Sequence, residues 1–147
     1  MMPGVRVRRV ASNPDLSLPS RQTPGSAGYD VSSAEPDFVL EPGERRAVGT
    51  GLTFEVAAGF EIQVRPRSGL ALRSGILVPN APGTVDSDYR GELKVILLNA
   101  GVAPVGIARG DRIAQLVFAR YETPTIEESE ALASSARGDG GFGSTGR

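Results

Sequence analysis

Short alternations of apolar and polar residues run through most of the chain. Residues 5–10 read VRVRRV, a pattern that predicts a β-strand with one covered face. Further runs rich in β-branched and aromatic residues follow, and turn sequences such as EPGE and AAG separate them. The expected strands are DVSSA, FVL, RRAVGTGLTFEV, FEIQVRP, ILVPN, the two arms of GTVDSDYRGELKVILLN around a turn at residues 87–91, and PVGIARGDRIAQLVFARY with a turn at RGD.

One segment predicts a helix instead. SGLALRSG, residues 68–75, has room for about two helical turns and ends at Gly75. TIEESEALASSA, residues 125–136, is polar and is open to two interpretations, a last strand or an irregular turn. The chain shows no internal repeat, no long linker and no βαβ alternation. The many short strand signals therefore predict an all-β fold, a jelly-roll sandwich or barrel with one short helix.

The chain contains neither cysteine nor histidine, and this narrows its chemistry. A disulfide framework, a Cys/His zinc site, a cysteine nucleophile and a histidine base are all excluded. Catalysis would have to use carboxylates, Arg, Lys, Ser, Tyr, backbone amides or an oxygen-bound metal. The length of 147 residues, with 39% hydrophobic and 22% charged, suits one globular domain.

Charge and hydropathy predict neither a nucleic-acid partner nor a membrane segment. The net charge is −1, so no overall basic signal is present. No apolar run reaches the length of a membrane span, and the initial MMPGVRVRRVA lacks the apolar core of a signal peptide. We therefore expect a cytoplasmic protein, and a chain without cysteine is compatible with that reducing compartment.

The segment GTVDSDYRGEL, residues 83–93, is the first candidate for chemistry. Asp86 and Asp88 lie two residues apart, and this spacing places side chains on one face of an extended strand. One interpretation is an ordinary hairpin turn, where Asp and Gly are favoured. The other is that Asp86, at a strand end, holds a water molecule as a general base, because a carboxylate is ionised near neutral pH.

The segment RPRSGLA, residues 65–71, is a candidate anion site. Arg67 and Ser68 stand at the start of the expected helix, where free backbone amides and a guanidinium group favour anions. The alternative is that Ser68 is an ordinary helix N-cap. RGDR, residues 109–112, is more typical of a plain turn than of an adhesion signal, and the absence of GxxxxGK[ST] excludes a P-loop. The dispersed Arg, Gly and Ser elements together favour a polyphosphate site.

The C-terminal RGDGGFGSTGR, residues 137–147, contains five glycines and one aromatic residue, Phe142. A segment so rich in glycine loses much entropy when it becomes ordered. We therefore expect one β domain over residues 1–136 and a flexible arm over residues 137–147.

The sequence resembles the homotrimeric dUTPases over nearly its whole length. That family carries five motifs in a fixed order, and each has a counterpart here. The counterparts are AGYDVSSAE (27–35), RPRSGLA (65–71), GTVDSDYRGEL (83–93), RGDRIAQLVF (109–118) and RGDGGFGSTG (137–146). The resemblance implies a jelly roll that hydrolyses dUTP to dUMP and pyrophosphate through attack of water on the α-phosphorus, which limits uracil in DNA and supplies dUMP for thymidylate synthesis.

The resemblance also implies a role for each matching residue. Asp86 would deprotonate the water, Tyr89 would stack under the deoxyribose and exclude a 2′-hydroxyl, and Asn80 would pair with uracil. Phe142 would stack on the base, and Asp30 would help to hold Mg²⁺, mostly through water, while the substrate phosphates hold the ion. The expected substrate-binding residues are Arg67, Ser68, Gly69, Asn80, Thr84, Val85, Asp86, Tyr89, Lys94, Gln115, Arg137, Phe142, Gly143, Ser144 and Thr145.

Finally, the resemblance implies a homotrimer in which subunits share each active site and the arm of one subunit closes the site of another. Two alternatives belong to other functional classes: a dCTP deaminase-type enzyme of the same fold, and a nucleotide-binding or signalling homologue without catalysis. The pair Asp86 and Tyr89, together with a full arm, argues against both.

Overall fold

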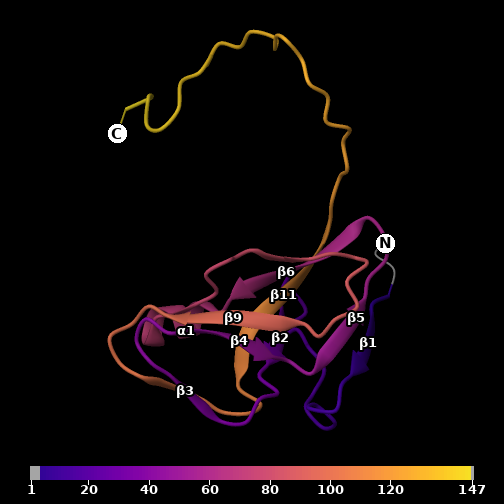
Figure 1. Cartoon of the computed structure of the whole chain (residues 1–147), viewed down its shortest axis with the longest axis vertical. Helices are drawn as coiled ribbons and strands as arrows, with labels where there is room; N and C mark the ends of the chain where they lie inside the picture. The colour runs from indigo at the N-terminus through magenta and orange to yellow at the C-terminus, as the bar shows by residue number, and fades with distance from the viewer. Residues whose placement is uncertain (1–3, 147) are drawn as a thin grey trace.

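The computed structural model describes residues 4–146, and its regular elements are almost all β-strands (Figure 1). Residues 1–3 of the expected domain and residue 147 of the expected arm lie outside the described part. The strands are β1 (Arg6–Arg9), β2 (Tyr29–Ser32), β3 (Phe38–Leu40), β4 (Arg45–Gly49), β5 (Leu52–Glu55), β6 (Phe60–Pro66), β7 (Ile76–Leu77), β8 (Gly83–Val85), β9 (Lys94–Asn99), β10 (Val105–Ile107) and β11 (Arg112–Arg120). A single helix, α1 (Ser68–Ser74), lies among them. The all-β prediction with one short helix is confirmed.

The strands form two larger sheets and two antiparallel pairs. One sheet has the order β2-β11-β6-β8 and the other the order β4-β9-β7, while β1 pairs with β5 and β10 pairs with β3. Strand β11 has nine residues and forms antiparallel ladders with β2 on one side and β6 on the other. Segments far apart in the sequence therefore meet along β11.

One hydrophobic core takes side chains from both larger sheets. Ile62 on β6 and Leu116 on β11 come from the first sheet, and Val95 and Leu97 on β9 come from the second. All four are about fully buried, with exposed fractions of 0%. Every second residue of β9 points into this core, as its period-two pattern predicts.

The segment around residues 87–91 differs from the expected hairpin. Both arms are strands, but β8 pairs with β6, so that Val85 lies opposite Ile62, whereas β9 pairs with β4 and β7. No ladder within residues 4–146 joins β8 to β9. The turn therefore carries the chain from one sheet to the other, because each arm buries its apolar residues against a different neighbour.

Helix α1 ends at Gly75, as the sequence predicts, but it begins differently from the interpretation of Ser68 as N-cap. Gly75 has a positive φ of 69° and ends the helix, and its N–H group donates to the carbonyls of Ala71 and Leu70, as a left-handed glycine cap does. Arg67 is the N-cap residue and forms no side-chain capping bond. The assignment of Ser68 as the N-cap is therefore wrong, and Ser68 is the first helical residue.

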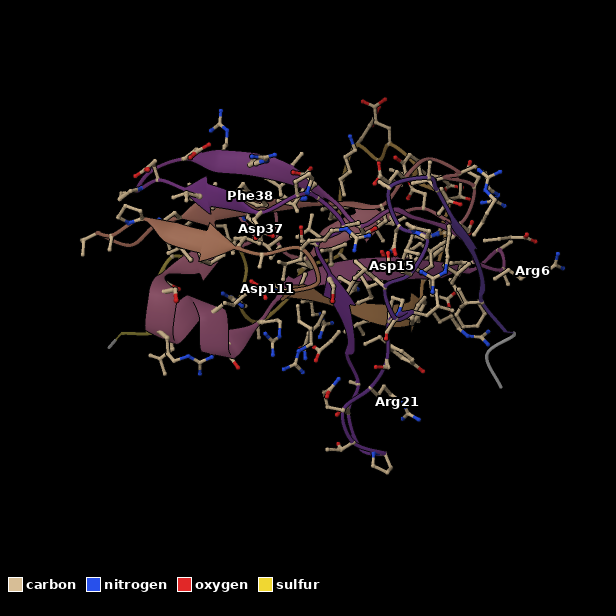
Figure 2. The ribbon with its side chains drawn as sticks, turned by 90° about the horizontal axis from the view of Figure 1, so that it is seen from below. Arg6, Asp15, Arg21, Asp37, Phe38 and Asp111 are labelled. Atoms are coloured by element: carbon tan, nitrogen blue, oxygen red, sulfur yellow. The ribbon has the colours of Figure 1, made fainter. Side chains whose placement is uncertain are left out.

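The RGD sequence is a structural turn. Arg109 donates to Asp15 Oδ1 over 2.8 Å and to the Ser12 carbonyl over 3.1 Å, and the Asp111 carboxylate accepts the Ala108 N–H. The hydrogen bonds from Arg109 hold the pKa of Asp15 below its ordinary value. Figure 2 labels Asp15 and Asp111 beside this turn. These bonds attach the loop after β1 to the start of β11, which confirms the plain-turn interpretation.

After β11 the chain leaves the β domain (Figure 1). The N–H of Tyr121 donates to the Gly59 carbonyl over 3.1 Å, and every later hydrogen bond in the described chain stays within residues 122–146. Residues 122–136 contain neither helix nor strand, so the possible last strand at residues 125–136 does not form in this single chain. None of the helices within residues 4–146 is long and apolar enough to cross a membrane.

The core makes a direct prediction for stability. Leu97→Ala should lower the free energy of unfolding by about 2–5 kcal/mol, because Leu97 is fully buried and its truncation leaves a cavity. Leu72→Ala is the matched control, since Leu72 on α1 is 89% exposed. Urea unfolding of both variants at one protein concentration measures the difference, and equal losses would contradict this description of the core.

Candidate active site

The first cluster of predicted site residues lines a groove at the ends of β8 and β9. The groove has a volume of about 320 Å³. It contains the predicted residues Thr84, Val85, Asp86, Tyr89 and Lys94, together with Ala47, Glu92, Leu93 and Ile96. Since β8 and β9 belong to different sheets, the turn between them spans this groove and supplies the side chain of Asp86.

Tyr89 and Asp86 are fixed by their own turn. The Tyr89 N–H donates to the Asp86 carbonyl over 3.2 Å, and the Tyr89 hydroxyl donates to the Glu92 carbonyl over 3.0 Å. The ring lies over Gly91, where a Cβ atom would be only 2.3 Å from the Tyr89 oxygen. Glycine at this position therefore allows the aromatic ring to lie beside the exposed Asp86 carboxylate.

Asn80 stands at the other end of β8. It lies in the turn before the strand, is exposed, and its Nδ2 atom would be 3.1 Å from a Cβ atom on Gly83. The absence of a side chain on Gly83 lets the amide approach the backbone of β8. Asn80 is thus a turn residue whose side chain lies next to the strand that carries Thr84 and Val85, where an amide can form paired hydrogen bonds with a planar base.

The second cluster surrounds the buried carboxylate of Asp30 on β2. Arg112 Nη1 lies 3.0 Å from Asp30 Oδ2, Gln115 Nε2 lies 3.1 Å from Oδ1, and Arg67 Nε lies 3.6 Å from Oδ1. Arg67 also donates to the Arg112 carbonyl over 3.1 Å. The fold therefore gathers predicted phosphate-binding residues around the residue predicted to assist the metal.

A β-bulge lets both Arg112 and Gln115 reach the same carboxylate. Residues three apart point to opposite faces of a regular strand. The pairing of β11 with β2 shifts register between Arg112 and Ala114, while Gln115 remains directly opposite Asp30. An extra residue at a bulge turns the strand locally, so both side chains lie on the side of Asp30.

Sequence reasoning missed two residues of these clusters. Arg112 lies within RGDRIAQLVF, but the sequence analysis assigned it no role. The only signal in the sequence was its position as the second arginine of RGDR. Glu92 lines the groove, and its Oε1 atom accepts the Gly51 N–H over 2.8 Å, which fixes the segment after the turn. Neither contact is visible in the sequence, because the partners are distant along the chain.

Other predicted residues are not brought to either cluster. Ser68 is exposed in the first turn of α1, and Gly69 lies against the Arg73 guanidinium. Within the described chain, Arg137 donates to the Gly140 carbonyl and Phe142 is fully exposed, while Gly143, Ser144 and Thr145 stay in the extended arm. The arm does not contact the two clusters in this single chain.

The two clusters lie on one sheet but do not touch. Gln115 pairs with Arg65 and Thr84 pairs with Gln63, so both clusters have positions beside β6. No hydrogen bond or ion pair between residues 4 and 146 joins the Asp30 cluster to Asp86 or Tyr89. A single chain therefore presents two partial sites.

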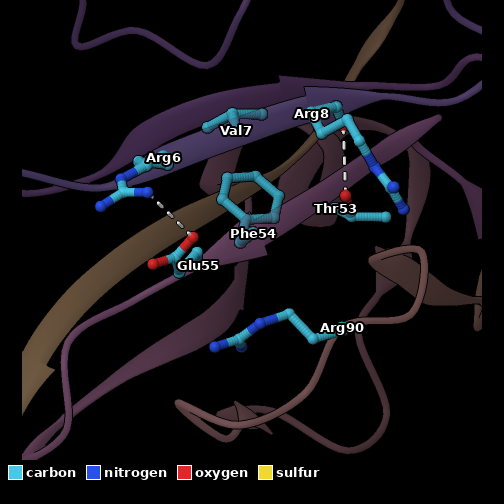
Figure 3. A pocket seen from close by; sticks show the side chains of 7 residues that line it. All are labelled: Arg6, Val7, Arg8, Thr53, Phe54, Glu55 and Arg90. Carbon is cyan, nitrogen blue, oxygen red and sulfur yellow. Dashed lines mark hydrogen bonds and ion pairs between the residues drawn. The ribbon is translucent and has the colours of Figure 1, made fainter.

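A groove of about 500 Å³ lies elsewhere, between β1, β5 and the turn after β8 (Figure 3). Arg6, Arg8 and Arg90 border it around Phe54. It contains none of the predicted site residues. Its contribution to the site is indirect, since Arg90 donates to the carbonyls of Ser87 and Tyr89 and so supports the turn that carries Tyr89.

The jelly roll, an exposed carboxylate beside an aromatic ring, and a separate cluster of arginines define a class of nucleotide-binding hydrolase. Comparison with known proteins makes this specific, because the dUTPase family model matches residues 15–146. The chain belongs to the dUTPase family.

Curated relatives that carry the corresponding enzyme name align with this chain over nearly their full length. The deoxyuridine 5'-triphosphate nucleotidohydrolase of Anaeromyxobacter sp. (strain Fw109-5) is 58% identical over 144 residues, which cover 97% of each chain. The enzyme of that name from Brucella melitensis biotype 1 is 50% identical over 147 residues, which cover 98% of this chain and 94% of the relative.

Solved structures agree with the fold. Staphylococcus bacteriophage 80alpha dUTPase with dUPNHPP matches with a TM-score of 0.88 and 27% identity, over 98% of this chain and 99% of that chain. A mutant dUTPase from phage phi11 of S. aureus, described with a structural Mg(II) ion, matches with a TM-score of 0.80 and 25% identity, over 90% of this chain and 100% of that chain.

The packing of Tyr89 makes a prediction about the groove. Gly91→Ala should displace the ring, because a Cβ atom would lie 2.3 Å from the Tyr89 oxygen. The near-ultraviolet circular dichroism spectrum should change, since the chain has three tyrosines and no tryptophan. Gly106→Ala is the control, because no atom lies within 4 Å of a Cβ atom there. Identical spectra for both variants would count against the described position of Tyr89.

Proposed function

We propose that this protein hydrolyses dUTP to dUMP and pyrophosphate. The observation that carries the proposal is the groove that places Asp86 beside Tyr89, Thr84 and Lys94 in a chain of the dUTPase family. The reaction removes dUTP, which limits uracil incorporation into DNA, and supplies dUMP for thymidylate synthesis. Since its substrate is a precursor of DNA, we also propose a cytoplasmic location.

In this proposal Asp86 is the catalytic base. Its carboxylate is exposed at the end of β8, where it can accept a proton from a water molecule that attacks the α-phosphorus. The Tyr89 ring, supported by Gly91, forms the surface on which the deoxyribose stacks. A 2′-hydroxyl would meet this ring, so a ribonucleotide is rejected by exclusion.

Uracil would bind along β8. The side chain of Asn80 and the backbone of Thr84, Val85 and Asp86 offer donors and acceptors at a strand edge, with Lys94 across the groove. This arrangement mimics base pairing, and a narrow slot would exclude the 5-methyl group of thymine. Phe142 of the arm would cover the base.

The triphosphate would bind at the second cluster. Arg67 and Gln115 would supply donors from the cluster itself, and Ser68 and Gly69, which follow Arg67 in the first turn of α1, would add donors beside it. Arg137, Gly143, Ser144 and Thr145 would add donors from the arm. This division places the nucleoside in one partial site and the phosphates in another.

We propose Mg²⁺ as the metal, in keeping with the structural Mg(II) ion described for the phage phi11 dUTPase. Between residues 4 and 146 no three acidic side chains gather as a metal site, and Asp30 already accepts hydrogen bonds from Arg112 and Gln115 and forms an ion pair with Arg67. The residues present fit an ion held chiefly by phosphate oxygens and water, with Asp30 contacting it only through water. When bound, the ion neutralises phosphate charge and aligns the triphosphate.

We further propose a homotrimer with shared sites. The separation of the two clusters within one chain, and the arm that extends away from its own domain, support sites assembled from several subunits (Figure 1). In this proposal residues 1–136 form the β domain and residues 137–147 form the arm that closes a neighbour's site. A dCTP deaminase-type activity is not favoured, since the family match is to dUTPase.

The activity is tested by measuring pyrophosphate release from dUTP, UTP and dCTP. We expect efficient release from dUTP alone, because the Tyr89 ring and the base slot exclude the other two, and we expect a chelator to reduce it. Release from dUTP no faster than from UTP would refute the proposal.

Asp86→Asn tests the base. Turnover should fall by about 10²–10⁴-fold, because the amide cannot accept the proton, whereas binding of a non-hydrolysable dUTP analogue should change little. Asp88→Asn is the matched control, since Asp88 is an exposed residue of the same turn that does not line the groove. Full activity in Asp86→Asn would exclude the assignment.

Deletion of residues 137–147 tests the arm. The truncated protein should keep its fold and oligomeric state, because no hydrogen bond of the described arm reaches the β domain. Its kcat/KM should fall by about 100-fold, since the arm positions and encloses the substrate. Light scattering and steady-state kinetics provide the two measurements, and a truncated protein with normal kinetics would leave the arm without a catalytic role.

A further inference from the structure

The Asp30 cluster places its negative charge beneath its positive charges. The Asp30 side chain is only 4% exposed, whereas those of Arg67 and Arg112 are 24% and 47% exposed. The carboxylate thus forms the floor of the cluster, and the two guanidinium groups face outward. An incoming anion would meet the arginines and not the aspartate.

The contacts of the cluster leave donors free. A guanidinium group has five N–H donors. Arg67 directs Nε toward Asp30 and Nη1 to the Arg112 carbonyl, and Arg112 uses Nη1 for Asp30. Gln115 gives one amide hydrogen to Asp30 Oδ1. The remaining N–H groups are held in fixed directions without being consumed.

We propose that Asp30 is a positioning residue and that Arg112 is an additional phosphate-binding residue. Asp30 fixes Arg67, Arg112 and Gln115 in one arrangement before the triphosphate arrives. The inference rests on the proposed function, and it adds to the proposed water-mediated metal contact of Asp30 a second role that does not require the metal. The bulge in β11 contributes to this arrangement, because it brings Arg112 to the same carboxylate as Gln115.

Physical reasoning favours positioning over simple attraction. A buried carboxylate reduces the net positive charge, so it weakens long-range attraction of a phosphate. Long arginine side chains, however, lose much rotamer freedom when they bind, and an ion pair already in place removes that loss from the binding step. Asp30 therefore acts through the arginines and not by touching substrate.

The test uses Asp30→Asn, which is nearly isosteric, and Arg112→Gln, which alters a half-exposed side chain. Binding of inorganic tripolyphosphate and of a non-hydrolysable dUTP analogue is measured by calorimetry with magnesium and again with a chelator. Each variant should weaken both probes by about tenfold under both conditions, while dUMP affinity stays nearly unchanged.

The double variant provides a second readout. Its loss of affinity should be smaller than the product of the two single losses, because Asp30 acts partly through Arg112. Asp15→Asn is the matched control, since Asp15 forms a similar 2.8 Å pair with Arg109 but is 64% exposed. Its affinities should match those of the unaltered protein.

Two results would overturn the inference. One is a loss in Asp30→Asn that appears only with magnesium and disappears with the chelator, which would leave Asp30 with the metal contact alone. The other is additive losses in the double variant. Because tripolyphosphate carries no nucleoside, its binding tests the cluster even if the protein fails to hydrolyse dUTP.

Discussion

The pairing of β11 with both β2 and β6 is the constraint on which the Asp30 cluster depends. Gln115 lies opposite Asp30 on one side and Arg65 on the other. Asp30 and Gln115 are 85 residues apart in the sequence, yet they form a hydrogen bond. Strand pairing thus brings together side chains that are distant in the sequence, which local sequence preferences could not do. The hydrophobic core beneath the strands keeps this pairing in register.

Local sequence signals predicted the elements better than their partners. The period-two runs identified most strands, and Gly75 identified the end of α1 because a left-handed residue there favours glycine. The pairing of β8 with β6 was not predictable in this way. Two strands around a short turn ordinarily pair with each other, and here burial against different sheets decides instead.

In the candidate site, too, individual residues could be predicted but their contacts could not. The resemblance to a family named Asp86, Tyr89 and Gln115, and the structure places the first two in one groove. The contact of Arg112 with Asp30 could not be predicted, because it depends on a bulge, and residues three apart would otherwise face opposite ways. The closeness of the Tyr89 ring to Gly91 likewise follows from tertiary packing and not from spacing.

The bulge in β11 also bears on how this chain can vary. A substitution changes one side chain, whereas a one-residue insertion or deletion in a regular strand changes the phase of every residue after it. At the bulge this does not hold, because without the extra residue the strand would be regular: Arg112 and Gln115 would be two positions apart, opposite Ser32 and Asp30, and still on one face. The extra residue instead concerns the core, since Ile113 and Ala114 are consecutive and both buried. The bulge thus lets β11 bury two neighbouring apolar residues while Arg112 and Gln115 both reach Asp30.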